Sequence, residues 1–157
     1  MSVAIPLPLA GGCQCGACRY VIAVEPLTLY ACHCTECQRQ TGSAFGLSMP
    51  TPRAGFAITA GTPVTWRRAA ASGRAVECAA CPICGTRLAH FPTRNDAIVN
   101  VKPGTLDDTR WLRPVGHLWT RSAQPWVEIP AGVIAYEGQP PDFDALYAAW
   151  AAWTARM

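Results

Sequence analysis

The chain has 157 residues, of which half are apolar and 15% are charged, and its formal net charge is +3. This composition is typical of a compact globular protein and excludes a disordered one. The small, scattered charge argues against a nucleic-acid partner, and no apolar stretch is long enough to span a membrane. We expect a single domain over residues 1–157, with its core over 11–137.

The first residues, MSVAIPLPLAGG, lack a basic start, and Pro6 and Pro8 break their apolar run. They do not resemble a signal peptide, which predicts a cytoplasmic protein whose thiols stay reduced. The chain has nine cysteines, an odd number that fits a disulfide framework poorly. Clustered thiols in this setting favour metal binding.

Short runs of β-branched and aromatic residues, separated by Gly, Pro and Asp, predict a mainly β protein. The predicted strands are 19–24, 27–31, 45–49, 56–59, 64–68, 87–91, 97–101 and 115–120. One helical turn is predicted over 38–43, closed by Gly42. It is expected to form one wall of a pocket beside the cysteines that precede it.

The last part of the chain predicts a helix over 142–156, because its aromatic residues recur at helical spacing in an alanine-rich run. Asp142 or Asp144 is expected to cap its start. The helix is expected to lie on the core. A homodimer through this helix is the alternative, since an uncovered aromatic row is an adhesive surface.

Two distant cysteine pairs predict a closed zinc site. Cys13 and Cys15 precede Gly16, which allows a tight backbone turn. The later motif Cys-Pro-x-Cys-Gly, at Cys81 and Cys84, is typical of a zinc knuckle. Four thiolates satisfy a tetrahedral ion, so this site is expected to be structural and to clamp distant segments together.

A third motif, Cys32-His33-Cys34-Thr35-Glu36-Cys37, predicts an open zinc site. Three thiolates converge only around a cation, and zinc takes Cys sulfurs at about 2.3 Å. No fourth cysteine follows nearby in the sequence. Three protein ligands leave one corner of the ion for a substrate atom, which is typical of catalytic zinc.

Two groups of basic residues are of note, Arg67-Arg68 and the segment around Arg110 and Arg113. The simpler interpretation is solvated surface. The alternative is that one of these arginines receives a carboxylate of an acidic ligand.

The order of motifs is similar to that of a known family. The residues that carry the similarity are Gly12-Cys13, Cys15-Gly16, Arg19-Tyr20, Cys32-His33-Cys34, Cys37, Cys81, Cys84-Gly85-Thr86, Gly104-Thr105-Leu106-Asp107-Asp108, His117 and Trp126. They resemble the glutathione-dependent formaldehyde-activating enzymes, or S-(hydroxymethyl)glutathione synthases, a family that includes centromere protein V-like proteins. The resemblance covers roughly residues 11–137.

This resemblance implies several small coiled antiparallel β-sheets around zinc, in a fold related to methionine sulfoxide reductase B. It implies two zinc ions per chain. The implied ligands of the structural zinc are Cys13, Cys15, Cys81 and Cys84, and those of the catalytic zinc are Cys32, Cys34 and Cys37.

The chain departs from the family pattern at Cys18 and in the segment Cys78-Ala79-Ala80. Family members usually have an apolar residue at position 18, and a basic and an aromatic residue at 78 and 80. Cys18 and Cys78 create three local triplets, 13/15/18, 32/34/37 and 78/81/84. Two free, buried thiols are one interpretation, and a rearranged or larger metal cluster is the other. The missing basic residue weakens the case for glutathione itself.

The implied activity is that of a zinc-dependent carbon–sulfur lyase or synthase, which joins a small thiol such as glutathione to an aldehyde such as formaldehyde. Zinc holds a bound thiol deprotonated, and three thiolates keep that sulfur nucleophilic. Arg39 is the predicted substrate-binding charge. His33, His90 and His117 are weaker candidates for a catalytic role.

Two other functions remain open. One is a non-catalytic zinc-binding module, in which both sites are structural, because the sequence shows no convincing acid–base pair near the thiols. The other is a zinc or redox sensor, in which exposed thiolates release zinc on oxidation.

Overall fold

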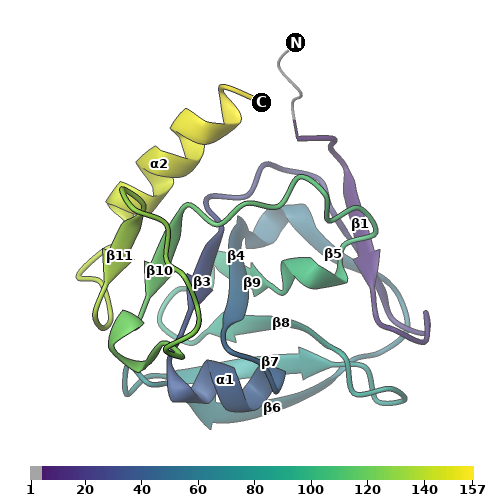
Figure 1. The fold of residues 1–157 in the computed structure, drawn as a ribbon. Helices are drawn as coiled ribbons and strands as arrows, with labels where there is room; N and C mark the ends of the chain where they lie inside the picture. Colours follow the sequence, from purple (N-terminus) through teal and green to yellow (C-terminus); the bar gives the residue numbers. More distant parts are fainter. Residues whose placement is uncertain (1–4) are drawn as a thin grey trace.

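Two β-sheets form the framework of the computed structural model, which describes residues 5–157 (Figure 1). Residues 1–4, the start of the segment interpreted above as lacking a signal peptide, lie outside the described residues. The smaller sheet is antiparallel and has the order β1-β2-β5. Its strands are β1 (Leu9–Gly12), β2 (Arg19–Ile22) and β5 (Phe56–Ala60).

The larger sheet has eight strands in the order β11-β10-β3-β4-β9-β8-β7-β6. These strands are β3 (Tyr30–Cys32), β4 (Gly46–Pro52), β6 (Val64–Ala69), β7 (Ala75–Ala80), β8 (Arg87–Pro92), β9 (Ile98–Val101), β10 (Gly116–Leu118) and β11 (Ile134–Tyr136). Neighbouring strands are antiparallel, except that β10 pairs in parallel with both β3 and β11. The expected mainly β fold with antiparallel sheets is confirmed, although one sheet is larger than expected and contains parallel pairs.

The helix α1 (Thr35–Thr41) starts earlier than the predicted turn, because Cys34 caps it and accepts a hydrogen bond from the backbone N–H of Cys37. Its predicted end is confirmed. Gly42 has φ 61°, and its N–H donates to the Gln38 carbonyl. Three short 3₁₀ segments, Arg53–Gly55, Pro103–Thr105 and Thr120–Ser122, complete the helical part. In residues 5–157, no helix is both long and apolar enough to cross a membrane.

The predicted C-terminal helix is confirmed as α2 (Asp144–Thr154). It runs beside β10 and β11 (Figure 1), and it buries Leu146 and Trp150. The N-cap is Phe143, which makes no side-chain capping bond, so neither Asp142 nor Asp144 occupies the predicted capping position. Asp142, just before the cap, accepts a hydrogen bond from the backbone N–H of Asp144 at 3.0 Å. The helix therefore lies on the core as expected, and a homodimer through it stays a prediction.

The strand register assigns different roles to the two faces of the large sheet. Residues directly opposite each other on neighbouring strands point to the same side. Cys78, His90 and Asn100 therefore share one face, and Ser48 of β4 lies on it as well. The other face carries apolar side chains of the main hydrophobic core: Met49, Ala89, Val99 and Val101.

Three strands were not predicted: β1, β7 and β11. β1 reads Leu-Ala-Gly-Gly and β7 reads Ala-Val-Glu-Cys-Ala-Ala, so both lack the β-branched runs that identify strands. Pairing with the strands next to them in the chain forms them instead, β1 with β2 and β7 with β6 and β8. β7 matters for the site, because it leads directly into Cys81.

Candidate metal centres and the adjoining cavity

The sulfur atoms of four cysteines predicted to hold one zinc lie within 4.8 Å of one another. They belong to Cys13, Cys15, Cys81 and Cys84. The Sγ–Sγ distance is 3.6 Å between Cys13 and Cys15 and 3.7 Å between Cys15 and Cys81. A tetrahedral zinc with Zn–S bonds of about 2.3 Å requires sulfur separations of about 3.8 Å. The cluster therefore fits zinc.

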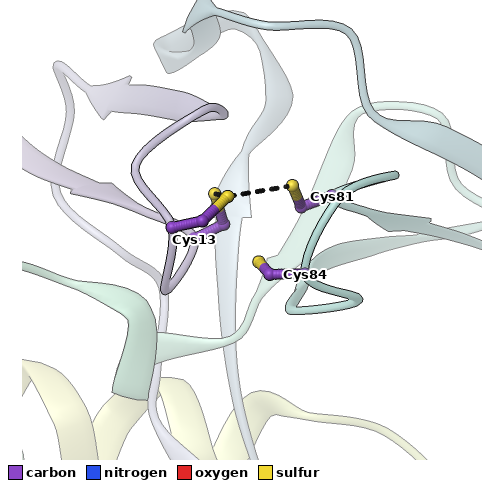
Figure 2. A group of neighbouring side chains, drawn as sticks. Cys13, Cys81 and Cys84 are labelled. Atoms are coloured by element: carbon purple, nitrogen blue, oxygen red, sulfur yellow. Dashed lines mark hydrogen bonds between the residues drawn. The ribbon is translucent and has the colours of Figure 1, made fainter.

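Two tight turns position these four thiols. Figure 2 shows Cys13, from the turn after β1, facing Cys81 and Cys84, from the turn after β7. Gly16 and Gly85 take positive φ values of 80° and 75° there, which a residue with a Cβ adopts only with strain. The two turns lie far apart in sequence, so an ion held between them would clamp the small sheet to the large one.

Hydrogen bonds in the same turns favour the thiolate form. The backbone N–H of Cys18 donates to Cys13 Sγ at 3.2 Å, and that of Ile83 donates to Cys81 Sγ at 3.4 Å. The hydroxyl of Thr86 lies 3.1 Å from Cys84 Sγ and lowers the pKa of Cys84 to about 5. Hydrogen bonds to the charged form stabilise it, as metal ligands require.

The remaining predicted ligands form a second cluster. The sulfurs of Cys32, Cys34 and Cys37 lie within 4.8 Å of one another. Cys32 ends β3, Cys34 caps α1 and Cys37 lies in the first turn of α1. Hydrogen bonding from the thiols of Cys32 and Cys37 lowers the pKa of Cys34 to about 2. Three convergent soft donors, each of which binds zinc as a thiolate, fit a zinc ion.

Neither cluster in the described residues includes Cys18 or Cys78. Both are buried, and burial raises the pKa of Cys18 to about 11. Cys78 accepts a hydrogen bond from Nη2 of Arg87 at 3.4 Å. The structure favours two buried thiols outside the metal clusters over a rearranged cluster.

The two clusters differ in what surrounds them. All three cysteines of the second cluster line a cavity of about 280 Å³, whereas the cysteines of the first cluster do not. The cavity lies over the face of the large sheet that carries Ser48, His90 and Asn100. The segments 70–75 and 92–95 and the start of α2 complete the wall of the cavity. Trp119 and Phe143 are among the lining residues.

A buried ion–dipole contact lies on the same face. Nζ of Lys102 donates to Oγ of Ser48 at 3.1 Å, and Ser48 lines the cavity. The pKa of Lys102 is lowered to about 8, first by burial and then by the neighbouring Arg87, although Cys37 and Cys32 partly oppose this effect. Lys102 therefore brings positive charge close to the three thiols.

Arg39 is exposed on α1 and does not line this cavity. It borders a separate hollow, together with Gln38, Gly42, Ser43 and Trp126, that includes no cysteine. Gln38 is held in place, because its Nε2 donates to the carbonyls of His33 and Ser122, each at 2.8 Å. The role of Arg39 in substrate binding stays a prediction.

The histidines of the sequence differ in their surroundings. His33 Nε2 lies 2.9 Å from His117 Nδ1, and both rings are buried. Burial lowers the pKa of both, so the pair is neutral and links β3 to β10. His90 lines the cavity.

The comparisons with known proteins agree with this geometry. The chain matches the family model described as glutathione-dependent formaldehyde-activating enzyme over residues 8–122, well over half of its length. No curated protein matches the chain. The crystal structure of a Rhodobacter sphaeroides protein is similar, with a TM-score of 0.51, 16% sequence identity, and coverage of 81% of this chain and 98% of that chain. At this identity the likeness supports the fold alone. The family match shows that the chain belongs to the glutathione-dependent formaldehyde-activating enzyme family.

Proposed function

We propose that the protein is a zinc-dependent carbon–sulfur lyase or synthase that joins a small thiol to an aldehyde such as formaldehyde. Family membership supports a reaction of glutathione-like thiols with formaldehyde. The observation that carries the proposal is the second cluster: its three thiols converge and also line a cavity. A purely structural site has no need of such access.

In this proposal the two clusters have different roles. The four thiols of Cys13, Cys15, Cys81 and Cys84 hold the structural zinc, and those of Cys32, Cys34 and Cys37 hold the catalytic zinc. When bound at the second cluster, zinc supplies an open coordination position that keeps a substrate thiol deprotonated. The three cysteines orient that sulfur toward the cavity, where the aldehyde binds.

The reaction breaks the S–H bond of the thiol and forms a bond between its sulfur and the carbonyl carbon. The proton that the thiol gives up ends on the carbonyl oxygen, which becomes a hydroxyl. That oxygen gains negative charge as the bond forms and needs a hydrogen-bond donor. Lys102 already donates to Ser48 Oγ, which leaves the Ser48 hydroxyl proton free to be donated to the oxygen. Ser48 and Lys102 are therefore the proposed stabilising pair.

Cobalt substitution tests the open site. We expect titration with glutathione or cysteine to strengthen the sulfur-to-cobalt absorption, because the thiol becomes a fourth sulfur ligand. The Cys34→Ser variant should lose this response, whereas the control Cys18→Ala, which removes a thiol outside both clusters, should retain it.

Turnover is measured separately, as exchange of ¹³C-formaldehyde with its thiol adduct by nuclear magnetic resonance. We expect the protein to accelerate exchange above the uncatalysed rate. An unchanged cobalt spectrum with every thiol, together with no acceleration, would leave the non-catalytic zinc module as the better interpretation.

A further inference from the structure

Four basic side chains gather on the cavity face of the large sheet. Arg68 comes from β6, Arg87 and His90 come from β8, and Lys102 follows β9. Arg68 and His90 line the cavity directly, and Lys102 reaches it through Ser48. These four residues are called the cationic cluster below.

No carboxylate accompanies the cationic cluster. Among the cavity-lining residues that the structure describes, none is acidic. The ion pairs found in residues 5–157 join Arg19 to Asp107, Arg67 to Glu77 and Arg110 to Asp108, and none involves the cluster. Arg67 shows the contrast, since it lies next to Arg68 on β6, is exposed and has an acidic partner.

Several donors of the cluster are buried without an acceptor. Nε of Arg68, Nε of Arg87 and Nδ1 of His90 have no hydrogen-bond partner. A buried, unpaired polar group destabilises the folded protein, and a charged one does so more strongly. The native structure therefore holds unsatisfied donors and like charges around one cavity.

Electrostatic effects within the cluster agree with this geometry. Burial lowers the pKa of Arg87, and the charge of Arg68 lowers it further. Burial lowers the pKa of His90, and the charges of Lys102, Arg87 and Arg68 add to this effect. The positive charges of Arg68, Arg87 and Lys102 therefore repel one another and disfavour a proton on His90. An anion placed among them would relieve the repulsion.

We propose that Arg68 and His90, the members of the cationic cluster that line the cavity, bind the carboxylate of the substrate thiol, whose sulfur lies at Cys32, Cys34 and Cys37. Arg87 and Lys102 add positive charge behind them, at Cys78 and Ser48. The inference rests on the proposed function and specifies its substrate class, small thiols that carry a carboxylate. Guanidinium groups bind carboxylates through paired N–H donors. Apolar lining residues such as Leu118 and Phe143 contact the carbon chain between the two ends.

A pair of matched thiols tests the proposal: 3-mercaptopropionate, which has a carboxylate, and 3-mercapto-1-propanol, which has a hydroxyl instead. Binding is measured with the cobalt-substituted protein, by absorption and by calorimetry. We expect the carboxylate thiol to bind at least about tenfold more tightly, as expected for charge-assisted hydrogen bonds. Propionate, which lacks the thiol, should compete with 3-mercaptopropionate.

The variant Arg68→Gln should lose most of this preference and leave the binding of 3-mercapto-1-propanol unchanged. Arg67→Gln is the control, because it removes the neighbouring arginine from the opposite face of β6 and should retain the full preference. The propionate competition is measured on the protein without a substitution. It therefore tests whether the site binds a carboxylate even where Arg68→Gln fails to fold.

Equal affinity for the two thiols, with no competition by propionate, would overturn the cationic cluster as a carboxylate site and leave the proposed function standing. Binding of neither thiol would overturn both. Loss of the preference in Arg67→Gln as well as Arg68→Gln would show a general effect of surface charge and contradict the assignment.

Discussion

Burial controls the protonation of the histidine in the cavity wall. The pKa of His90 lies well below its ordinary value, first because of burial and then because Lys102, Arg87 and Arg68 are nearby. The folded protein therefore keeps His90 neutral under conditions in which the unfolded chain takes up a proton. This difference makes stability depend on pH.

We predict that the free energy of unfolding falls as the pH drops below about 6.5, where His90 of the unfolded chain becomes protonated. The slope from this one group is at most about 1.4 kcal/mol per pH unit. His90→Gln should flatten it, as measured by denaturant unfolding between pH 8 and pH 5. Loss of metal in acid affects both proteins, so the difference between them is the readout. Parallel curves would contradict the prediction.

Loss of one thiol is expected to affect the stability of the protein differently in the two metal clusters. Cys81→Ser is expected to unfold or aggregate the protein, because Cys81 belongs to the set that joins two turns distant in sequence. Structural zinc contributes about 10–16 kcal/mol in small peptides, comparable to the stability of a whole domain. Cys34→Ser should leave the protein folded, because its cluster is local. Thermal unfolding with circular dichroism measures both, and equal damage would contradict the division of roles.

At the scale of elements, two backbone segments of the chain approach each other closely, β1 and the segment near Thr105. A Cβ on Gly11 would lie 2.6 Å from the backbone oxygen of Thr105 and still closer to the Tyr20 hydroxyl. That hydroxyl lies 2.8 Å from Oγ1 of Thr105 and forms a hydrogen bond with it. Glycine at position 11 is therefore required by packing.

We predict that Gly11→Ala destabilises the protein by about 1–3 kcal/mol, the usual cost of overpacking. Gly104→Ala is the matched control, because a Cβ there would meet no atom within 4 Å. Denaturant unfolding of the two variants gives the comparison. A Gly11→Ala protein as stable as the control would show that β1 shifts freely.

At the scale of the whole molecule, the clusters should bind metal with unequal strength. We predict about two zinc ions per chain, with the four-thiolate site retaining its ion longer during slow chelation. Elemental analysis of the freshly purified protein, repeated over the course of chelation, measures this. A single zinc, or the absorption of an iron–sulfur centre, would contradict it.

Part of the cavity comes from outside the segment that matches the family. The match ends at residue 122, yet Gln139, Phe143 and Tyr147 line the cavity. The C-terminal segment therefore shapes the space beside the three thiols, and we infer that it contributes to the choice of thiol. The interpretation of residues 1–157 as a single domain stays a prediction.

The cysteine spacing was sufficient to predict the cluster of Cys32, Cys34 and Cys37 and the two pairs 13/15 and 81/84, because ligands two or three residues apart converge through local turns. Tertiary structure brings the two pairs together. The periodicity of residues 142–156 was likewise sufficient for α2, and Gly42 for the end of α1. In these cases the signal lies within a few residues of the feature that it predicts. Strands β1 and β7 lack such a signal in their own residues, and pairing with the adjacent strands β2, β6 and β8 forms them.

The cationic cluster required the tertiary structure. The missing basic residue at position 78 weakened the case for glutathione itself in the sequence. The sheet nevertheless brings Arg87 to Cys78 and places Arg68, His90 and Lys102 on the same face. The sequence indicated Arg67-Arg68 as a candidate pair, and strand alternation separates them, one toward solvent and one toward the cavity. Which side a charge faces depends on register, which the pairing of β6 with β7 sets and the residues of β6 alone do not.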